Sequence, residues 1–545
     1  MSASPGKPPA TPDGNSLSTL QWGSPYASRR SPIIARNVVA SSQPLAVQAG
    51  IKILQSGGNA VDAAIATAIT LTVVEPNNNG LGSDAFAIVW DGKRAWGLNG
   101  SGKSPAAWNF EQFAHLKEMP ELGWDGVTVP GAVSTWVALS QKFGKLPFRR
   151  LFDSAIEYAM YGFPVGPITA TGWQKCPERF GNFPEFLAHF CPEGRAPQAG
   201  EMFVRTDMVK SLEQIADSKG ESFYRGELAE RIVQHAQNTN GWLTADDMEM
   251  HSPLWTPPVS QNYRHINLLE IPPNGQGLAA QIGLALLAHF ELSDADGADS
   301  AETIHLQVEC MKIAIRAAFE HFADPEAMLV EPEALLGKDV IKNAAAKITH
   351  KALNTPPALL PGSADTVYLT TADASGMMVS FIQSNYQGFG SGIVIPGTGI
   401  SLQNRGRGFS TRRDHPNAVA GSKRPFHTII PGFVSEAGKG RMSFGVMGGH
   451  MQHQGHLQMI SRIFDFQQNP QAAIDAPRWY LDADYSLILE AGFDNGTALE
   501  LKRRGHRVSI VDDPPLFGGA QIIYKLDDGY CAASDPRKEG QAAGF

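Results

Sequence analysis

The chain has 545 residues and little cysteine, and its cysteines do not form a recognisable ligand pattern. Only four are present, none belongs to a C-x-x-C pair, and they lie far apart, at Cys176, Cys191, Cys310 and Cys531. A disulfide framework or a cysteine-bound metal is therefore disfavoured, and we expect buried or free thiols.

Long apolar runs and an excess of basic residues are also missing. No stretch of about 18 apolar residues occurs, so no membrane span is expected. Residues 1–34 are rich in Pro, Ser and Gly and lack the apolar segment of a secretory signal, which predicts a disordered N-terminal arm. The formal net charge of −9 argues against nucleic acid or anionic membrane as a partner. A cytoplasmic location is expected by default.

Several catalytic and cofactor motifs are absent. The sequence has no G-x-S-x-G elbow and no H-E-x-x-H. The run 388–392 reads G-x-G-x-G, but it lacks the third glycine at dinucleotide spacing, and close backbone packing is favoured over nucleotide binding. His450, His453 and His456 would spread over about 120° of a helix without a neighbouring Cys or acidic cluster. Polar helix positions are favoured over a zinc site there, and we predict neither a metal nor a cofactor.

The residues that are present divide the chain at about position 365. Up to residue 353 most segments have apolar residues three or four apart, including a buried helix that Asn59 would cap. A hairpin is expected around Asp91 and Gly92. The segment 354–365, NTPPALLPGSAD, breaks the helical pattern with three prolines. Beyond it the sequence is rich in β-branched residues and glycine, so the boundary separates 35–365 from 366–545.

Two features after this boundary each allow a structural and a catalytic interpretation. Thr366 begins a predicted strand, and most threonines there are structural, but a threonine with a free α-amine serves as nucleophile and base in one residue. Such an amine titrates at about 7.7–8.0, and here it would require cleavage between Asp365 and Thr366. Gly448 and Gly449 separate a strand from a helix, where they could make a tight turn or supply backbone N–H groups to an oxyanion.

Eight or more blocks of the sequence, in order, resemble the γ-glutamyltransferase (γ-glutamyltranspeptidase) family of Ntn hydrolases. They include GGNAVDAAIATAITLTVVEPNNNGLGSDAF (57–86), SGIVIPGTGISLQNRGRGFS (391–410), GVMGGHMQ (445–452) and DPRKEGQAAGF (535–545). The resemblance implies a four-layer αββα sandwich made from one self-cleaved precursor. It also implies a large subunit, 35–365, and a small subunit, 366–545, that remain together as a heterodimer, with a dimer of heterodimers as a further possibility.

The resemblance also implies roles for individual residues. Thr366 would be the nucleophile of both self-cleavage and turnover, Ser384 would hydrogen-bond to it, and Gly448 and Gly449 would form the oxyanion hole. The substrate-binding positions it implies are Arg405, His427, Thr428, Asn385, Tyr386 and Ser101.

The sequence departs from the family pattern where γ-glutamyl-binding members hold the substrate's charged groups. Ser101 stands where those members have an arginine, with Lys103 nearby, and Gly408 stands where they have an acidic residue for the α-ammonium. Arg405 replaces a neutral glutamine, and His427-Thr428 replaces a serine pair.

These departures leave three hypotheses. The first is a self-processing amidohydrolase or acyltransferase that cleaves γ-glutamyl or related carboxylate-bearing amides through an acyl-threonine intermediate. The second is an oxamate- or glutaryl-type amide hydrolase without γ-glutamyl transfer. A carboxylate without an ammonium group suits the changed charges, and the pattern is similar to the branch that includes oxamate amidohydrolase, with glutaryl-type acylases as another branch. The third is an uncleaved, inactive binding protein. Arg405 could also be a surface ion pair, and Arg407 is expected to be solvated.

Overall fold

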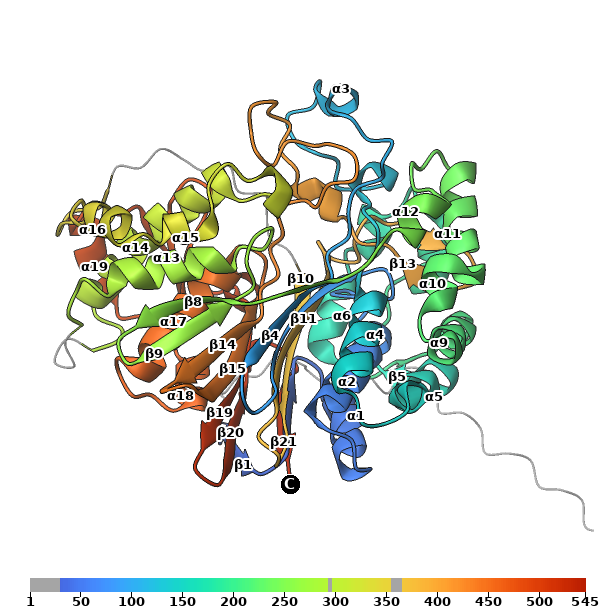
Figure 1. Ribbon diagram of the computed structural model, residues 1–545, viewed down its shortest axis with the longest axis horizontal. Coiled ribbons are helices and arrows are strands. Elements are labelled where there is room, and N and C mark those ends of the chain that lie inside the picture. The colour runs from blue at the N-terminus through green and yellow to red at the C-terminus, as the bar shows by residue number, and fades with distance from the viewer. Residues whose placement is uncertain (1–29, 293–296, 354–364) are drawn as a thin grey trace, which may run out of the picture.

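The structure, a computed structural model, describes residues 30–292, 297–353 and 365–545. Two seven-stranded antiparallel sheets occupy its centre (Figure 1). The first sheet has the order β1 (Ile33–Ala35), β20 (Gly529–Ser534), β19 (Gly519–Leu526), β15 (Lys439–Met447), β14 (Gly432–Glu436), β9 (Ile266–Glu270) and β8 (Val259–Tyr263). The second has the order β21 (Gln541–Gly544), β2 (Val38–Ser41), β10 (Asp365–Ala372), β11 (Met378–Tyr386), β3 (Asp84–Trp90), β4 (Ala95–Asn99) and β7 (Leu254–Thr256).

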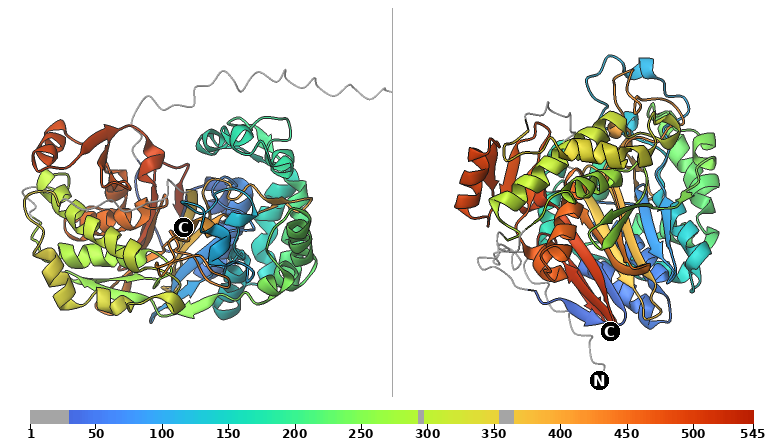
Figure 2. Two further views of the ribbon diagram at one scale, coloured as in Figure 1. Left: turned by 90° about the horizontal axis from the view of Figure 1, so that it is seen from above. Right: turned by 60° about the vertical axis from the view of Figure 1, so that its left-hand side comes forward.

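Helices cover the outer face of each sheet, and Figures 1 and 2 show the two helical groups on opposite sides of the molecule. The first sheet packs against α13 (Gly277–Leu287), α17 (Met451–Phe464) and α18 (Pro470–Asp475), and α14 (Ala301–His321) packs on α13. The second packs against α1 (Pro44–Gln55), α2 (Ala60–Val74) and α4 (Ala132–Phe143), and α5 (Asp153–Tyr161) packs on α2. A third apolar cluster, which includes Phe86, Tyr368, Ile382, Phe433 and Ile523, lies between the two sheets. The layers are therefore αββα, as predicted.

The remaining helices and strands lie outside the two central sheets and the helices named above. The helices are α3 (Phe110–Phe113), α6 (Pro167–Trp173), α7 (Cys176–Arg179), α8 (Pro184–Phe190), α9 (Thr206–Ser218), α10 (Glu221–Arg225), α11 (Glu227–Asn238), α12 (Ala245–Glu249), α15 (Pro332–Leu335), α16 (Lys338–Ala345) and α19 (Asn495–Arg503). The strands are β5 (Phe163–Pro164), β6 (Met202–Phe203), β12 (Val394–Ile395), β13 (Ile400–Ser401), β16 (Trp479–Leu481), β17 (Leu487–Glu490) and β18 (Val508–Val511).

Local sequence signals account for the elements nearest the centre. Asn59 caps α2 through a reciprocal hydrogen-bond pair with Asp62, and all 15 residues of the helix are buried, as its apolar sequence predicts. The hairpin β3–β4 turns at Asp91-Gly92, and β10–β11 turns at 373–377. At Gly390, φ is +74° and a Cβ would lie 2.4 Å from the carbonyl oxygen of Leu402. The glycine-rich run thus serves close backbone packing.

The two parts of the chain that meet at residue 365 build both sheets jointly. In the second sheet, β10 and β11 lie between β2 and β3, and in the first, β14 pairs with β9. Neither part therefore contains a complete sheet or a complete core of its own.

The N-terminal arm is shorter than the predicted 1–34. Ile33 and Ile34 already belong to β1, which pairs with β20, and the Arg30 guanidinium donates to the carbonyl oxygen of Gly540 at 2.6 Å. Residues 1–29 lie outside the described residues. All four cysteines are buried, and no disulfide joins them within the described chain. No described helix has the length and apolar character needed to cross a membrane.

Candidate active site

Thr366 lies on β10 opposite a bulge in the neighbouring strand. Asp365 pairs with Tyr386 and Val367 pairs with Gln383, so two residues of β11, Ser384 and Asn385, face Thr366. The Thr366 hydroxyl, in a residue only 1% exposed, donates to Ser384 Oγ at 3.2 Å. The Tyr386 N–H donates to the same oxygen at 2.8 Å. The fold thus brings together the two hydroxyls that the resemblance paired.

The bulge ends at Tyr386, whose backbone conformation is strained and whose ring lies against Arg405. Tyr386 has φ of +79°, an uncommon conformation for a residue with a side chain. Asn385 accepts a hydrogen bond from Ser83 Oγ at 2.7 Å, and its N–H donates to the carbonyl oxygen of Asn78 at 3.1 Å. These bonds fix Asn385 against the turn that precedes β3, so its observed contacts are structural.

Gly448 and Gly449 form the turn between β15 and α17. Their φ angles are +115° and +56°, and a Cβ on Gly448 would lie 3.0 Å from the Cα atom of Gly518. Their carbonyl oxygens accept hydrogen bonds from Met451 and Gln452. Within the described residues, neither glycine N–H donates a hydrogen bond, which leaves two backbone donors at the start of a helix for a developing negative charge.

Gln276, which the sequence analysis did not identify, joins this turn to two of the predicted substrate-binding positions, His427 and Thr428. Its Nε2 donates to the carbonyl oxygens of Thr428 at 2.5 Å and Gly449 at 2.8 Å. Its own N–H donates to the carbonyl oxygen of His427 at 3.1 Å, and its Oε1 accepts from His453 Nδ1 at 2.9 Å. A glutamine just before a helix gives no sequence signal for this role, because its partners are about 150 residues away.

Arg405 is a buried cation with unused hydrogen-bond donors. It begins the 3₁₀ turn η5 (Arg405–Gly408) and is 1% exposed. Its Nη1 donates to Thr428 Oγ1 at 2.8 Å, and its guanidinium lies 4.7 Å from the ring centre of Tyr386. Nε and Nη2 are buried and have no hydrogen-bond partner among the described residues. A surface ion pair is therefore excluded, and the open donors suit a carboxylate.

His427 is completely buried beside an acid that the sequence analysis also missed. Its Nε2 lies 3.1 Å from Oδ2 of Asp84, the first residue of β3. Burial, and secondarily the positive charge of Arg405, lowers the pKa of His427 well below its usual value. The imidazole is therefore neutral near pH 7. An acidic residue at the start of an otherwise apolar strand was the only available sign of Asp84.

Ser101 is buried, but among the described residues it makes no hydrogen bond to Arg405 or His427. Its Oγ donates to Asn99 Oδ1 at 2.7 Å, and Asn274 Nδ2 donates to that Oγ at 3.1 Å. Its carbonyl oxygen accepts from Arg424 Nε at 3.0 Å. These contacts hold a loop together, and its role in substrate binding stays a prediction.

The three regularly spaced histidines contact three different partners. His453 contacts Gln276, His456 Nδ1 lies 2.7 Å from Glu270 Oε1, and His450 packs against Phe426. Among the described residues, the metal-compatible cluster is a different one, His305, Glu309 and His506, where Glu309 already pairs with Lys312. The predicted absence of a metal at 450–456 stays a prediction.

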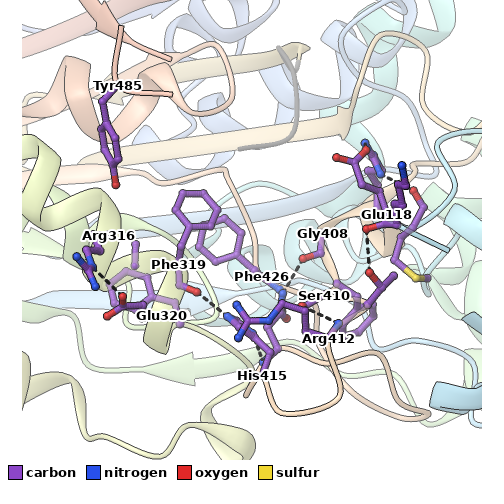
Figure 3. Close-up of a pocket in the computed structure, with 18 residues that line it drawn as sticks. Glu118, Arg316, Phe319, Glu320, Gly408, Ser410, Arg412, His415, Phe426 and Tyr485 are labelled. Carbon is purple, nitrogen blue, oxygen red and sulfur yellow. Dashed lines mark hydrogen bonds and ion pairs between the residues drawn. The ribbon is translucent and has the colours of Figure 1, made fainter. Parts of the chain in front are cut away.

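A cavity of about 310 Å³ adjoins the turn that carries Arg405. Figure 3 shows Phe319 and Phe426 beside Gly408, with Tyr485 at one end and the Arg316–Glu320 ion pair nearby. Arg407 also lines it, and this arginine is not solvated as expected. Its guanidinium pairs with Glu118 and donates to the carbonyl oxygen of Met119 at 2.6 Å, so its side chain is only 12% exposed.

Comparisons with known proteins agree over nearly the whole chain. A family profile described as Gamma-glutamyltranspeptidase matches residues 46–545. The glutathione hydrolase-like YwrD proenzyme of Bacillus subtilis is 36% identical over 95% of this chain and 100% of its own length. The oxamate amidohydrolase proenzyme of Klebsiella pneumoniae is 34% identical over 92% of this chain and 97% of its own. The crystal structure of cephalosporin acylase from Bacillus halodurans has a TM-score of 0.92 and 43% identity, over 97% of this chain and 99% of that one.

Proposed function

The chain belongs to the gamma-glutamyltranspeptidase family of Ntn hydrolases, and from that premise we propose that it cuts itself between Asp365 and Thr366 and then hydrolyses amides whose acyl group carries a carboxylate. The observation that carries the substrate proposal is Arg405, a buried cation with open donors and no acidic hydrogen-bond partner among the described residues. Gly408 supplies no carboxylate for a substrate ammonium, and an unpaired buried charge is costly.

The reaction would use one residue as nucleophile and base. The Thr366 hydroxyl attacks the substrate's amide carbonyl while the free α-amine of Thr366 takes its proton. The N–H groups of Gly448 and Gly449 stabilise the tetrahedral oxyanion, by about 3 kcal/mol for a well-placed donor. The amine then protonates the leaving nitrogen, the C–N bond breaks, and water hydrolyses the acyl-threonine ester.

Self-cleavage would use the same hydroxyl on the chain itself. Attack on the carbonyl carbon of Asp365 replaces the peptide bond by an ester, and water then releases Asp365 as a new C-terminus and Thr366 with a free amine. The bulge supports this step, because it places Ser384 Oγ within hydrogen-bonding distance of the attacking hydroxyl. The products would be the predicted large and small subunits.

Hydrolysis or transfer of γ-glutamyl groups is the competing function, which the name of the Bacillus subtilis relative suggests. The oxamate and cephalosporin names of the other relatives point instead to amides without that head group. Asp84 is the carboxylate whose charge acts on Arg405, but its oxygens already accept hydrogen bonds from Gly131 and His427. This arrangement favours a substrate without an ammonium group.

The test compares p-nitroanilides of three acyl groups of equal chain length: glutaryl, γ-glutamyl and pentanoyl. We expect kcat/KM to be highest for glutaryl. Arg405→Ala should raise KM for glutaryl by roughly 30–150-fold, equivalent to about 2–3 kcal/mol, and leave KM for pentanoyl unchanged.

Arg407→Ala is the matched control, because Arg407 lies on the same turn but pairs with Glu118. It should leave KM for glutaryl within twofold of wild type. Equal kcat/KM for glutaryl and pentanoyl, or a preference for γ-glutamyl that survives Arg405→Ala, would refute carboxylate recognition by Arg405.

A further inference from the structure

The mechanism above leaves one buried acid in the site without a role. Asp84 is 0% exposed and lies directly opposite Ser384 in the pairing of β3 with β11. The strand of Asp84, β3, is separated by β11 from β10, which carries Thr366. The Thr366 hydroxyl donates to that same serine. A buried carboxylate in this position is costly unless its oxygens are hydrogen-bonded and its charge is compensated.

The hydrogen bonds of Asp84 determine the tautomer of His427. Its Oδ1 accepts from the Gly131 N–H at 2.9 Å, and its Oδ2 lies 3.1 Å from His427 Nε2. His427 Nδ1 accepts a long hydrogen bond, 3.4 Å, from the Ile429 N–H. Since Nδ1 is the acceptor, Nε2 carries the proton and donates it to Asp84. Asp84 thus holds the ring edge-on to Phe86, with 4.8 Å between ring centres.

Arg405 supplies the compensating charge. It is the cation that interacts most strongly with Asp84, and Asp84 is in turn the anion that most favours the charged form of Arg405. The two side chains are both buried and share no hydrogen bond among the described residues. In the free enzyme, the negative charge of Asp84 therefore balances an arginine whose Nε and Nη2 remain available to a ligand.

A substrate carboxylate on Arg405 would add a second negative charge to this closed cluster. Two carboxylates that share one buried cation repel each other, and the less solvated one is the one expected to take up a proton. Burial already raises the pKa of Asp84 to about 7, against the opposing effect of Arg405. The charged and titratable groups that face Asp84 are Arg405 on η5, Arg424 and His427 on the segment before β14, and Tyr224 on α10.

We propose that Asp84 is a positioning and specificity-determining residue that orients His427, balances Arg405 in the free enzyme, and takes up one proton when a substrate carboxylate binds to Arg405. The inference rests on the proposed function and deepens it, because it makes the site selective for acyl groups with one negative charge. Affinity for such groups then falls as the pH rises through neutrality, whereas affinity for an uncharged acyl group does not.

The test measures Ki for glutarate, as a competitive inhibitor, between pH 6 and pH 8.5 in the processed wild type and Asp84→Asn proteins. Asparagine resembles the protonated acid in charge. The ratio of Ki in the wild type to Ki in Asp84→Asn should rise from about 1 at pH 6 to roughly 30 at pH 8.5. A free α-amine ordinarily titrates at about 7.7–8.0, and both proteins carry this amine on Thr366, so its contribution enters both Ki values and the ratio reports the difference that Asp84 makes.

Asp62→Asn is the control, since Asp62 is also a buried acid but accepts its hydrogen bonds from backbone N–H groups of Asn59, Lys145 and Leu146 at the start of α2. It should keep the wild-type pH dependence. If Asp84→Asn does not process, calorimetry of glutarate binding to the wild type in buffers of different ionisation enthalpy decides the question. It should show uptake of about half a proton per site at pH 7.

The outcomes distinguish the role of Asp84 from carboxylate recognition by Arg405. Failure of glutarate to inhibit at any pH would overturn carboxylate recognition itself. Inhibition with a flat Ki ratio, or binding without proton uptake, would overturn only the role of Asp84. Loss of γ-glutamyl hydrolysis alone in Asp84→Asn would also overturn it, by making Asp84 a partner for an ammonium group.

Discussion

At the scale of single residues, the site combines the Thr366 hydroxyl, which is oriented by Ser384, with the Arg405 guanidinium, whose Nε and Nη2 have no hydrogen-bond partner among the described residues. Thr366 and Ser384 are fixed by the bulge in β11, so the position of the proposed nucleophile depends on strand register. Arg405 contacts Thr428, just before β14, and Tyr386, at the end of β11, so the proposed substrate choice depends on side chains from three separate segments. Gln276 connects the two regions through the carbonyl oxygens of Thr428 and Gly449.

Gln276→Leu should therefore change catalysis as well as stability. It removes the side-chain donor to the Thr428 carbonyl oxygen, one of two donors to the Gly449 carbonyl oxygen, and the acceptor of His453 Nδ1. Each buried polar group left without a partner costs about 1–3 kcal/mol. Because the two carbonyls belong to the proposed substrate clamp and the proposed oxyanion turn, we expect kcat to fall and KM for a glutaryl amide to rise, each by about tenfold or more. Steady-state kinetics with a glutaryl p-nitroanilide measures both.

Gln281→Leu is a matched control on the same helix. Gln281 is also buried, and its Nε2 donates to the carbonyl oxygens of Val259 and Leu268 at 2.8 and 3.0 Å. It should lose a similar amount of stability with kcat and KM near wild type. Identical kinetic losses in both variants would reduce Gln276 to a structural residue.

The family resemblance pointed to Thr366, Ser384 and the glycine pair, and the structure shows the contact between the first two, whereas their catalytic roles stay predictions. No sequence pattern indicated the residues whose contacts depend on distant partners. Asp84 and its partner His427 lie 343 residues apart, so no local pattern announces that contact. The prediction that Arg407 is solvated was wrong for the same reason, because its partner Glu118 comes from the other part of the chain.

At the scale of elements, periodicity and turn residues predicted the central helices and hairpins well. The buried helix α2 and the strand–glycine–helix unit β15–α17 were both expected from local sequence. The short strand β1 was not, because three residues carry no periodic signal and the strand is stabilised by pairing with β20 near the other end of the chain.

The C-terminal family block, 535–545, connects β19, β17 and the residue before β16. Asp535 accepts hydrogen bonds from Arg478 Nη2 at 2.5 Å and Ala520 N–H at 2.7 Å, and Arg537 bridges to Glu490. Burial alone would raise the pKa of Asp535, but the charges of Arg478 and Arg537 lower it below its usual value.

Asp535→Asn should lower the free energy of unfolding by about 3–5 kcal/mol at pH 7, because it leaves Arg478 buried without its partner. The lowered pKa sets the sign of the pH dependence. The contribution of Asp535 is complete above the unfolded pKa of about 3.9 and is lost as the pH falls through the lower folded value. The difference in the free energy of unfolding between wild type and variant should therefore narrow below about pH 4.

Urea unfolding at pH 7 and at pH 3 measures that gap. The exposed Asp528, in the turn between β19 and β20, provides the control, and Asp528→Asn should stay within about 0.5 kcal/mol of wild type. A gap that is small at pH 7, or that widens in acid, would contradict the assignment of Asp535 to a stabilising network.

At the scale of the whole molecule, the sandwich explains how a cut chain would remain one particle. Both sheets contain strands from each side of residue 365, with β14 paired to β9 in the first sheet and β10–β11 between β2 and β3 in the second. The cluster between the sheets also contains residues from each part. Separation would expose that apolar surface and unpair strands on both sides. The layer order came from the family resemblance, since local patterns do not specify which distant strands pair. A dimer of heterodimers stays a prediction.

The most direct test of the central claim, that Thr366 acts with its own freed amine, is the intact mass of the active protein in denaturant. We predict two chains, the smaller being 366–545 with threonine at its N-terminus, from material that elutes as one particle under native conditions. Thr366→Ala should give one uncut chain without amidase activity. A wild-type enzyme that hydrolyses amides as a single intact chain would contradict the mechanism.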